Sequence, residues 1–294
     1  MDNKAKAKLI RAEKHIEKNW LLAEDILLEL LEDYPKLLKA YEMLYFIYMK
    51  HKLFRKAEHI IEKGLIELPE NSQLYFLMGN IFLSQQGKAQ KALDWYKKIT
   101  IQTPEMLFNK SVALVYLGHR KEGIACFKEA LPYFNNLPSS YTFLAEQYIA
   151  LKEYDNALSV LKSAEKKFPI NKDVILMVAK CYDKKKNWIQ AYLYYDKAAN
   201  LGQDSAEFFN NFAHCCYNIG EFEKAVAHFK DSISKNIFYI KSYIDLSKIY
   251  IAERDFTNAK KYLKIAHKID PLNIYITLAS ERLRRIFNQD EDKL

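Results

Sequence analysis

Residues 212–220, FAHCCYNIG, bring together side chains that could bind a metal ion or do thiol chemistry. His214 precedes the adjacent pair Cys215 and Cys216, and His228 follows in the next apolar segment. Zinc sites use such Cys and His ligands, but the side chains must converge on one point. Neighbouring residues on a helix point about 100° apart, so two adjacent cysteines cannot both face one ion. For a helical segment we therefore predict no metal site, and core packing for Cys216.

The rest of the chain lacks the common catalytic signatures. It contains no glycine-rich phosphate loop, no helical metalloprotease motif and no nucleophile elbow. Its histidines are dispersed and have no Cys, Asp or Glu at convincing ligand spacing. We therefore predict a protein that is not an enzyme, with no catalytic residue, cofactor or metal.

The composition favours a large helical protein. Half of the 294 residues are hydrophobic and 14% are aromatic, while glycine and proline number seven each. The net charge of +8 could attract nucleic acid or an acidic partner. Because acidic and basic residues are interleaved and the basic runs are short, a solvated helix surface is the favoured interpretation.

The sequence gives no sign of a membrane or an oxidising compartment. Its first residues, MDNKAKAKLIRAEK, lack the apolar segment of a signal peptide, and no run is long enough for a membrane span. Four scattered cysteines are too few for a disulfide framework in a chain of this length. We expect a cytoplasmic protein without membrane insertion.

A repeat of about 34 residues dominates the organisation. A small residue is followed by apolar or small residues four and seven positions later, a spacing that places all three on one helical face. The small residues are Ala23, Ala57, Ala92, Gly123, Ala157, Ala191, Ala225 and Ala259, at spacings of 34, 35, 31, 34, 34, 34 and 34. Each such helix follows another apolar stripe, so we predict helical hairpins.

Glycine, proline and polar residues mark the turns and the ends of these hairpins. The turn between the two helices carries Gly118 or Gly220, or a polar residue such as Lys152 or Arg254. A proline often follows the small residue by twelve positions, and we expect it to end the second helix because proline cannot donate into a helix. These prolines are Pro35, Pro69, Pro104, Pro169 and Pro271.

With these features the chain resembles the tetratricopeptide repeat family. The segments YTFLAEQYIALKEYDNALSVLKSAEKKFP (141–169) and SYIDLSKIYIAERDFTNAKKYLKIAHKIDP (242–271) carry its pattern of aromatic, Leu-small, Tyr, Ala and Pro positions. The resemblance implies an all-α fold, a right-handed superhelical α-solenoid of stacked antiparallel helix pairs in a single domain over 1–294. The expected repeats are 4–37, 38–71, 72–103, 104–137, 138–171, 172–205, 206–239 and 240–273. Residues 274–294 are expected to form a capping helix and a frayed tail.

The family resemblance also implies a concave groove lined by the first helix of each hairpin. The candidate peptide- or partner-binding residues are Met43, Phe46, Phe76, Asn80, Phe108, Asn109, Val112, Phe143, Met177, Lys180, Asn211, His214 and Lys241. Repeats two to six would offer an apolar wall, and repeats six to eight amides and basic groups. For any single aromatic residue, packing between repeats remains an alternative.

One variant of the family grips a peptide carboxylate with a clamp of Lys, Asn, Asn, Lys and Arg. Asn211 and Lys241 match two of these positions, but Leu176, Lys180 and Asp245 replace the others. We therefore do not expect a full clamp. The sequence favours a non-enzymatic scaffold or adaptor for a protein partner, with an RNA-binding helical-repeat protein as the alternative. The partner's identity and the oligomeric state stay open.

Overall fold

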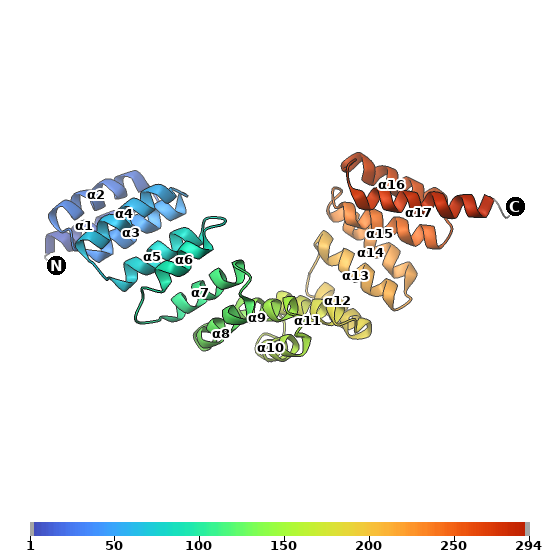
Figure 1. Cartoon of the computed structure of the whole chain (residues 1–294), viewed down its shortest axis with the longest axis horizontal. Helices are drawn as coiled ribbons and strands as arrows, with labels where there is room; N and C mark the ends of the chain where they lie inside the picture. The colour runs from blue at the N-terminus through green and yellow to red at the C-terminus, as the bar shows by residue number, and fades with distance from the viewer. Residues whose placement is uncertain (1–2, 292–294) are drawn as a thin grey trace. The chain divides into compact units, whose positions relative to one another are not determined.

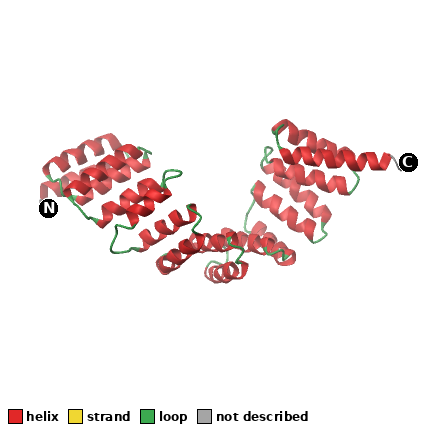
Figure 2. Ribbon diagram, viewed as in Figure 1, coloured by secondary structure: helices red, strands yellow, loops and turns green. Residues whose placement is uncertain are grey.

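The structure, a computed structural model, describes residues 3–291, with side chains described through residue 287. This part of the chain consists of helices joined by short loops and contains no strand (Figure 2). Its contacts divide the chain into two compact units, Met1–Asn136 and Leu137–Leu294. The predicted all-α repeat fold is confirmed. A single continuous solenoid stays a prediction.

The first unit contains four helix pairs and one short 3₁₀ helix, and Figure 1 shows the pairs in chain order. The helices are α1 (Asn3–His15), α2 (Trp20–Asp33), α3 (Leu38–Lys50), α4 (Phe54–Glu67), α5 (Ser72–Leu83), α6 (Ala89–Tyr96), α7 (Pro104–Tyr116), α8 (Arg120–Ala130) and η1 (Leu131–Tyr133). The odd-numbered helix of each pair is a first helix, and the even-numbered one is a second helix. Helix α1 buries Ala5, Leu9 and Ala12 and exposes most of its other residues.

The second unit contains four more pairs and a terminal helix. Its helices are α9 (Pro138–Ala150), α10 (Tyr154–Lys167), α11 (Lys172–Lys184), α12 (Trp188–Asn200), α13 (Ala206–Asn218), α14 (Phe222–Lys235), α15 (Ile240–Ala252), α16 (Phe256–Ile269) and α17 (Ile274–Glu291). Residues 292–294 of the expected tail lie outside the described residues. In the described part of the chain, no helix has the length and apolar character needed to cross a bilayer.

Side-chain caps fix the start of several helices. The side chain of Asn71 accepts a hydrogen bond from the Leu74 amide at 3.1 Å, and Asn171 caps α11 in the same way. Thr103 accepts a hydrogen bond from the Met106 amide at 3.2 Å. Such caps satisfy amide groups that have no partner inside the helix, so these sequence positions determine where the helices begin.

The prolines agree with the prediction at four of five positions. Pro35, Pro69, Pro169 and Pro271 each follow the end of a second helix by two residues. The prediction is wrong for Pro104, which is the first residue of α7 and so starts a first helix. The preceding helix, α6, has already ended at Tyr96, shortly before the segment Ile99–Thr100–Ile101. Branched side chains of this kind lower helix propensity, and proline is favoured in the first turn of a helix.

The turns inside the hairpins share a left-handed backbone conformation. Gly118 and Gly220 have φ values of 84° and 87°, and Lys152 and Arg254 have φ values of 62° and 60°. The amide after each of these residues bonds back to the carbonyl of the preceding helix, as in Glu221 N to Cys216 O at 2.9 Å. The expected equivalence of these turn positions is confirmed.

Small residues let neighbouring helices approach closely. The repeated alanines of the second helices, such as Ala57, Ala157 and Ala259, are fully buried. Gly79 of α5 lies against the ring of Tyr96, to which a Cβ atom at Gly79 would come within 2.3 Å. The packing of α5 on α6 therefore requires a residue without a side chain at position 79.

A buried polar network lies where α13, α14 and α15 meet. Asn210 Nδ2 donates to Ser242 Oγ at 3.0 Å, and the Ser242 and Ser232 hydroxyls lie 2.7 Å apart. Ser232 Oγ also donates to the carbonyl of Ala206 at 2.6 Å. All three side chains are inaccessible to solvent. Three helices are therefore joined by hydrogen bonds as well as by apolar contacts.

Candidate functional site

The two adjacent cysteines of residues 212–220 belong to the core. Cys215 and Cys216 are both fully buried on α13, and Cys215 Sγ donates to the carbonyl of Trp188 at 3.1 Å. Burial raises the pKa of each thiol to about 12. Core packing of Cys216 is confirmed. Within the described residues, no three His, Cys, Asp or Glu side chains gather in a way that could hold a metal ion.

The apolar candidates of the first unit differ widely in exposure. Met43 is buried in the core, whereas Phe46, three residues later on α3, is 50% exposed. Phe76 is half-buried and lies 6.2 Å from the Tyr96 ring, measured between centroids. Of these three first-helix positions, Phe46 offers the most surface for a partner.

The remaining apolar candidates are half-buried. Phe108 of α7 packs against the rings of Phe127 and Phe134, with centroid distances of 5.5 and 5.9 Å. Val112 lies one turn further along α7 and is also half-buried. In the second unit, Phe143 of α9 and Met177 of α11 are half-buried, and Met177 packs on a core cluster that includes Ala145 and Val178. These side chains take part in repeat packing while showing one edge to solvent.

The asparagine candidates of the first unit form an amide–phenol cluster. Asn80 Oδ1 accepts hydrogen bonds from Tyr96 Oη at 2.6 Å and from Asn109 Nδ2 at 2.8 Å. Burial raises the pKa of Tyr45 on the neighbouring helix α3. The cluster joins α5, α6 and α7. Both asparagines remain half-buried, so they lie at the edge of the packed interior.

The polar candidates of the second unit form charged pairs between neighbouring first helices. Lys180 Nζ on α11 donates to Glu207 Oε1 on α13 at 2.8 Å. This bond and the Lys180 charge lower the pKa of Glu207, and a hydrogen bond from Asn211 lowers it further. Lys241 of α15 is exposed and adds positive charge near Glu207. Burial raises the pKa of Asp183, against the nearby charges of Lys184, His214 and Lys241.

His214 and Asp245 form the next pair in this row. His214 Nε2 lies 2.7 Å from Asp245 Oδ2, and Lys248 Nζ donates to Asp245 Oδ1 at 2.8 Å. Burial raises the pKa of Asp245, but the bonds and charges of His214 and Lys248 outweigh it and lower that pKa to about 2. The carboxylate lines a pocket of about 180 Å³ together with Tyr217 and Arg282. Asp245, which stands where a clamp would have arginine, is thus a buried anion.

One geometric rule connects these contacts. Asn80 and His214 are the ninth residues of α5 and α13, and their partners Asn109 and Asp245 are the sixth residues of α7 and α15. Lys180 is likewise a ninth residue, and its partner Glu207 lies on the next first helix, α13. Sequence reasoning missed Glu207 and Asp245 as partners. Glu207 and Asp245 could have been predicted by searching for pairs of polar residues that lie 27 to 31 positions apart on consecutive first helices.

Comparison with known sequences points to one repeat type. A model of the tetratricopeptide repeat matches residues 240–271, which cover α15 and α16. Tetratricopeptide repeat protein 21B of Mus musculus is 26% identical over 140 residues, which are 46% of this chain and 10% of that protein. Tetratricopeptide repeat protein 21A of Mus musculus is 24% identical over 248 residues, which are 79% of this chain and 18% of that protein. The chain thus spans less than a fifth of the length of these relatives.

Solved structures share the fold at low identity. The C-terminal part of a TPR repeat-containing protein from Cytophaga hutchinsonii aligns with a TM-score of 0.63 and 14% identity, covering 80% of this chain and 97% of that one. A chain of the APC/C hetero-tetramer Cut9–Hcn1 aligns with a TM-score of 0.58 and 17% identity, covering 95% of this chain and 55% of that one. The type IV pilus biogenesis factor PilW aligns with a TM-score of 0.57 and 18% identity, covering 67% of this chain and 93% of that one.

These structural likenesses concern the fold alone, because the identities are low. They agree with the antiparallel helix pairs, the small-residue period of about 34 and the repeat matched at 240–271. Together these observations identify residues 240–271 as a tetratricopeptide repeat and show that the chain is similar to tetratricopeptide repeat proteins.

Proposed function

We propose that the protein is a non-enzymatic, cytoplasmic scaffold that binds a peptide or partner helix in a groove lined by its first helices. Tetratricopeptide repeat proteins generally mediate protein–protein interactions. The observation that supports this surface is the row of polar side chains at the sixth and ninth positions of successive first helices. In the second unit, Lys180, Asn211 and His214 keep part of their surface in solvent, and Lys241 is exposed. These groups are the hydrogen-bonding complement of an extended peptide backbone.

Within the first unit, considered by itself, the proposed first-helix surface is largely apolar. Phe46 is the main exposed aromatic residue among the candidates, and the edges of Phe76 and Phe108 lie on the following first helices of the same unit. An exposed aromatic residue on a rigid helix is a favourable anchor, because it loses little conformational entropy on binding. Asn80 and Asn109 flank this apolar part with amide groups that are already held in place by their mutual bond. We propose that the remaining candidates, Met43, Val112, Phe143 and Met177, mainly support these contacts through packing.

Affinity capture with matched variants tests the proposal. Phe46→Asp and Lys241→Glu change exposed first-helix residues and leave the core intact. Their controls are Ile66→Asp, at a second-helix residue that is 79% exposed, and Lys230→Glu on the second helix α14. We expect the first pair of variants to lose partners that the wild type and both controls recover. Equal recovery by all five proteins contradicts a first-helix binding surface. The similar proteins give no support to the RNA-binding alternative.

A further inference from the structure

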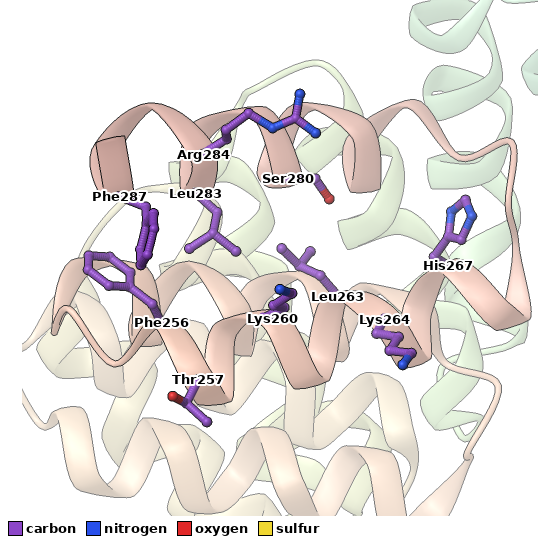
Figure 3. Close-up of a pocket in the computed structure, with 10 residues that line it drawn as sticks. All are labelled: Phe256, Thr257, Lys260, Leu263, Lys264, His267, Ser280, Leu283, Arg284 and Phe287. Atoms are coloured by element: carbon purple, nitrogen blue, oxygen red, sulfur yellow. The ribbon is translucent and has the colours of Figure 1, made fainter. Parts of the chain in front are cut away.

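A second hollow lies between the last second helix, α16, and the terminal helix, α17. It has a volume of about 810 Å³, and Figure 3 shows it between α16 and α17. Four apolar side chains line it. Leu263 and Leu283 lie between the two helices, while Phe256 and Phe287 meet edge to face at one end, with ring centroids 5.6 Å apart. Phe287 is 42% exposed. Volumes of this size are typical of sites that enclose a ligand.

The ionisable side chains that line the α16–α17 groove are all basic. Lys260, Lys264 and His267 come from α16, and Arg284 comes from α17, while no Asp or Glu among the side chains described through residue 287 lines the groove. Among the described residues, none of these four basic groups forms an ion pair with a carboxylate. Residues 256–287 hold seven Lys or Arg but two Asp or Glu. This excess of five, in about a tenth of the chain, accounts for most of the net charge of +8.

We propose that the α16–α17 groove binds an acidic amphipathic helix of a partner protein. The apolar floor would receive a stripe of aliphatic or aromatic side chains, and the basic rim would pair with flanking carboxylates. The site is separate from the proposed first-helix surface, because a second helix and the terminal helix form it. A bilayer presents a flat surface that cannot fill the hollow, and nucleic acid needs phosphate contacts spread beyond a single groove.

The direct test uses synthetic probes and the full chain. The probe is a fluorescent peptide with Leu at spacings of three and four and Glu elsewhere, and the control peptide has Lys in place of every Glu. Fluorescence anisotropy should show binding of the Glu peptide alone. That binding should weaken between about 50 mM and about 500 mM NaCl, because screening shortens the range of charge attraction. Failure of the Glu peptide to bind at low salt, or equal binding of the Lys peptide, overturns the proposal.

Charge-reversal variants then locate the site. Lys260→Glu with Lys264→Glu should weaken binding by about tenfold or more, because two attractive contacts become repulsive. The matched control is Lys162→Glu with Lys166→Glu, two exposed lysines at the same spacing on the second helix α10. Phe287→Ala should also weaken binding, through the loss of apolar floor. Circular dichroism shows whether each variant keeps its helices.

Three further results decide the outcome. Equal affinity of the Lys260/Lys264 and Lys162/Lys166 variants places the peptide elsewhere and overturns the proposal. Displacement of the peptide by phosphatidylserine vesicles or by single-stranded RNA, at lower concentration than unlabelled peptide, overturns it in favour of those ligands. Ile66→Asp, on the second helix α4 and outside both proposed surfaces, should leave the affinity unchanged. Partner capture with Phe46→Asp and Lys241→Glu tests the first-helix surface, and peptide anisotropy with Lys260→Glu and Lys264→Glu tests the α16–α17 groove, so the failures of the two proposals are distinguishable.

Discussion

Replacing Gly79 by alanine should destabilise the first unit, although alanine is the better helix former. Gly79 lies in the middle of α5, and its neighbour across the hairpin is Tyr96, which is 2% exposed. An added Cβ atom would lie 2.3, 2.7 and 2.9 Å from three atoms of the Tyr96 ring. The ring cannot turn away freely, because its hydroxyl donates to Asn80 at 2.6 Å. The methyl group must therefore displace the ring or push α5 away from α6.

The expected cost follows from three contributions. Overpacking of a core by one methyl group costs about 1–3 kcal/mol, and here the contact is closer than atoms tolerate. Loss of the Tyr96–Asn80 hydrogen bond adds about 1 kcal/mol. Alanine recovers about 1 kcal/mol relative to glycine in a helix interior. The net decrease in the free energy of unfolding is therefore about 2 kcal/mol.

Urea denaturation followed by circular dichroism measures this decrease, and hydrogen exchange of residues 72–96 shows whether it is local. The rescue variant combines Gly79→Ala with Tyr96→Leu, which removes the ring. Tyr96→Leu alone should destabilise the protein, and in that background Gly79→Ala should cost little, giving a coupling energy of about 1–2 kcal/mol. A Gly79→Ala protein at least as stable as the wild type would refute the steric reasoning, as would additive effects in the double variant.

Three other outcomes follow from the structure. Gly220→Ala should lower the free energy of unfolding by about 1–2 kcal/mol in urea titration, because Gly220 has a φ of 87° with open space around it, so the cost is one of backbone conformation. Asp245 has a folded pKa of about 2, lower than its usual 3.8, so its stabilisation is present above pH 4 and is lost as the pH falls toward 2. Between pH 4 and pH 2, the free energy of unfolding of the wild type should fall by about 2 kcal/mol more than that of Asp245→Asn, as measured by thermal melts. With a thiol reagent near pH 8, Cys126 should react first in the native protein, and Cys215 and Cys216 after unfolding, because burial raises the pKa of the latter two to about 12.

Much of the fold could be predicted because the spacing of about 34 residues between small residues reflects close packing between helices. The buried alanines such as Ala157 and Ala259 recur wherever a second helix meets its neighbours, and no polar or bulky residue could replace them. Pro104 shows the limit of this reasoning, because a proline at the expected spacing can end one helix or begin the next. Whether the proline follows a second helix or begins a first helix depends on the residue at which the preceding helix ends. Helix propensity determines that residue only weakly.

The candidate surface was harder to predict because exposure on a first helix depends on partners that lie elsewhere in the sequence. Met43 and Phe46 are three positions apart on one helix, yet one is buried and the other is half-exposed. Phe108 is partly covered by Phe134, which follows α8 and η1. Helical periodicity gives the direction of a side chain but does not show which ring from a following segment will cover it.

The buried hydrogen bonds among Asn210, Ser232 and Ser242 bear on the fidelity of assembly. Repeats with similar apolar faces can stack in the wrong order or swap between chains, which is a characteristic failure of repeat proteins. The helical position of Ser242 is occupied by Leu74 in α5 and by Val174 in α11. A hairpin with either residue, docked in place of α15 and α16, would leave the Asn210 amide without its acceptor, at a cost of about 1–3 kcal/mol. The network thus distinguishes α15 from α5 and α11, but not from α9, which has Ser140 at this position.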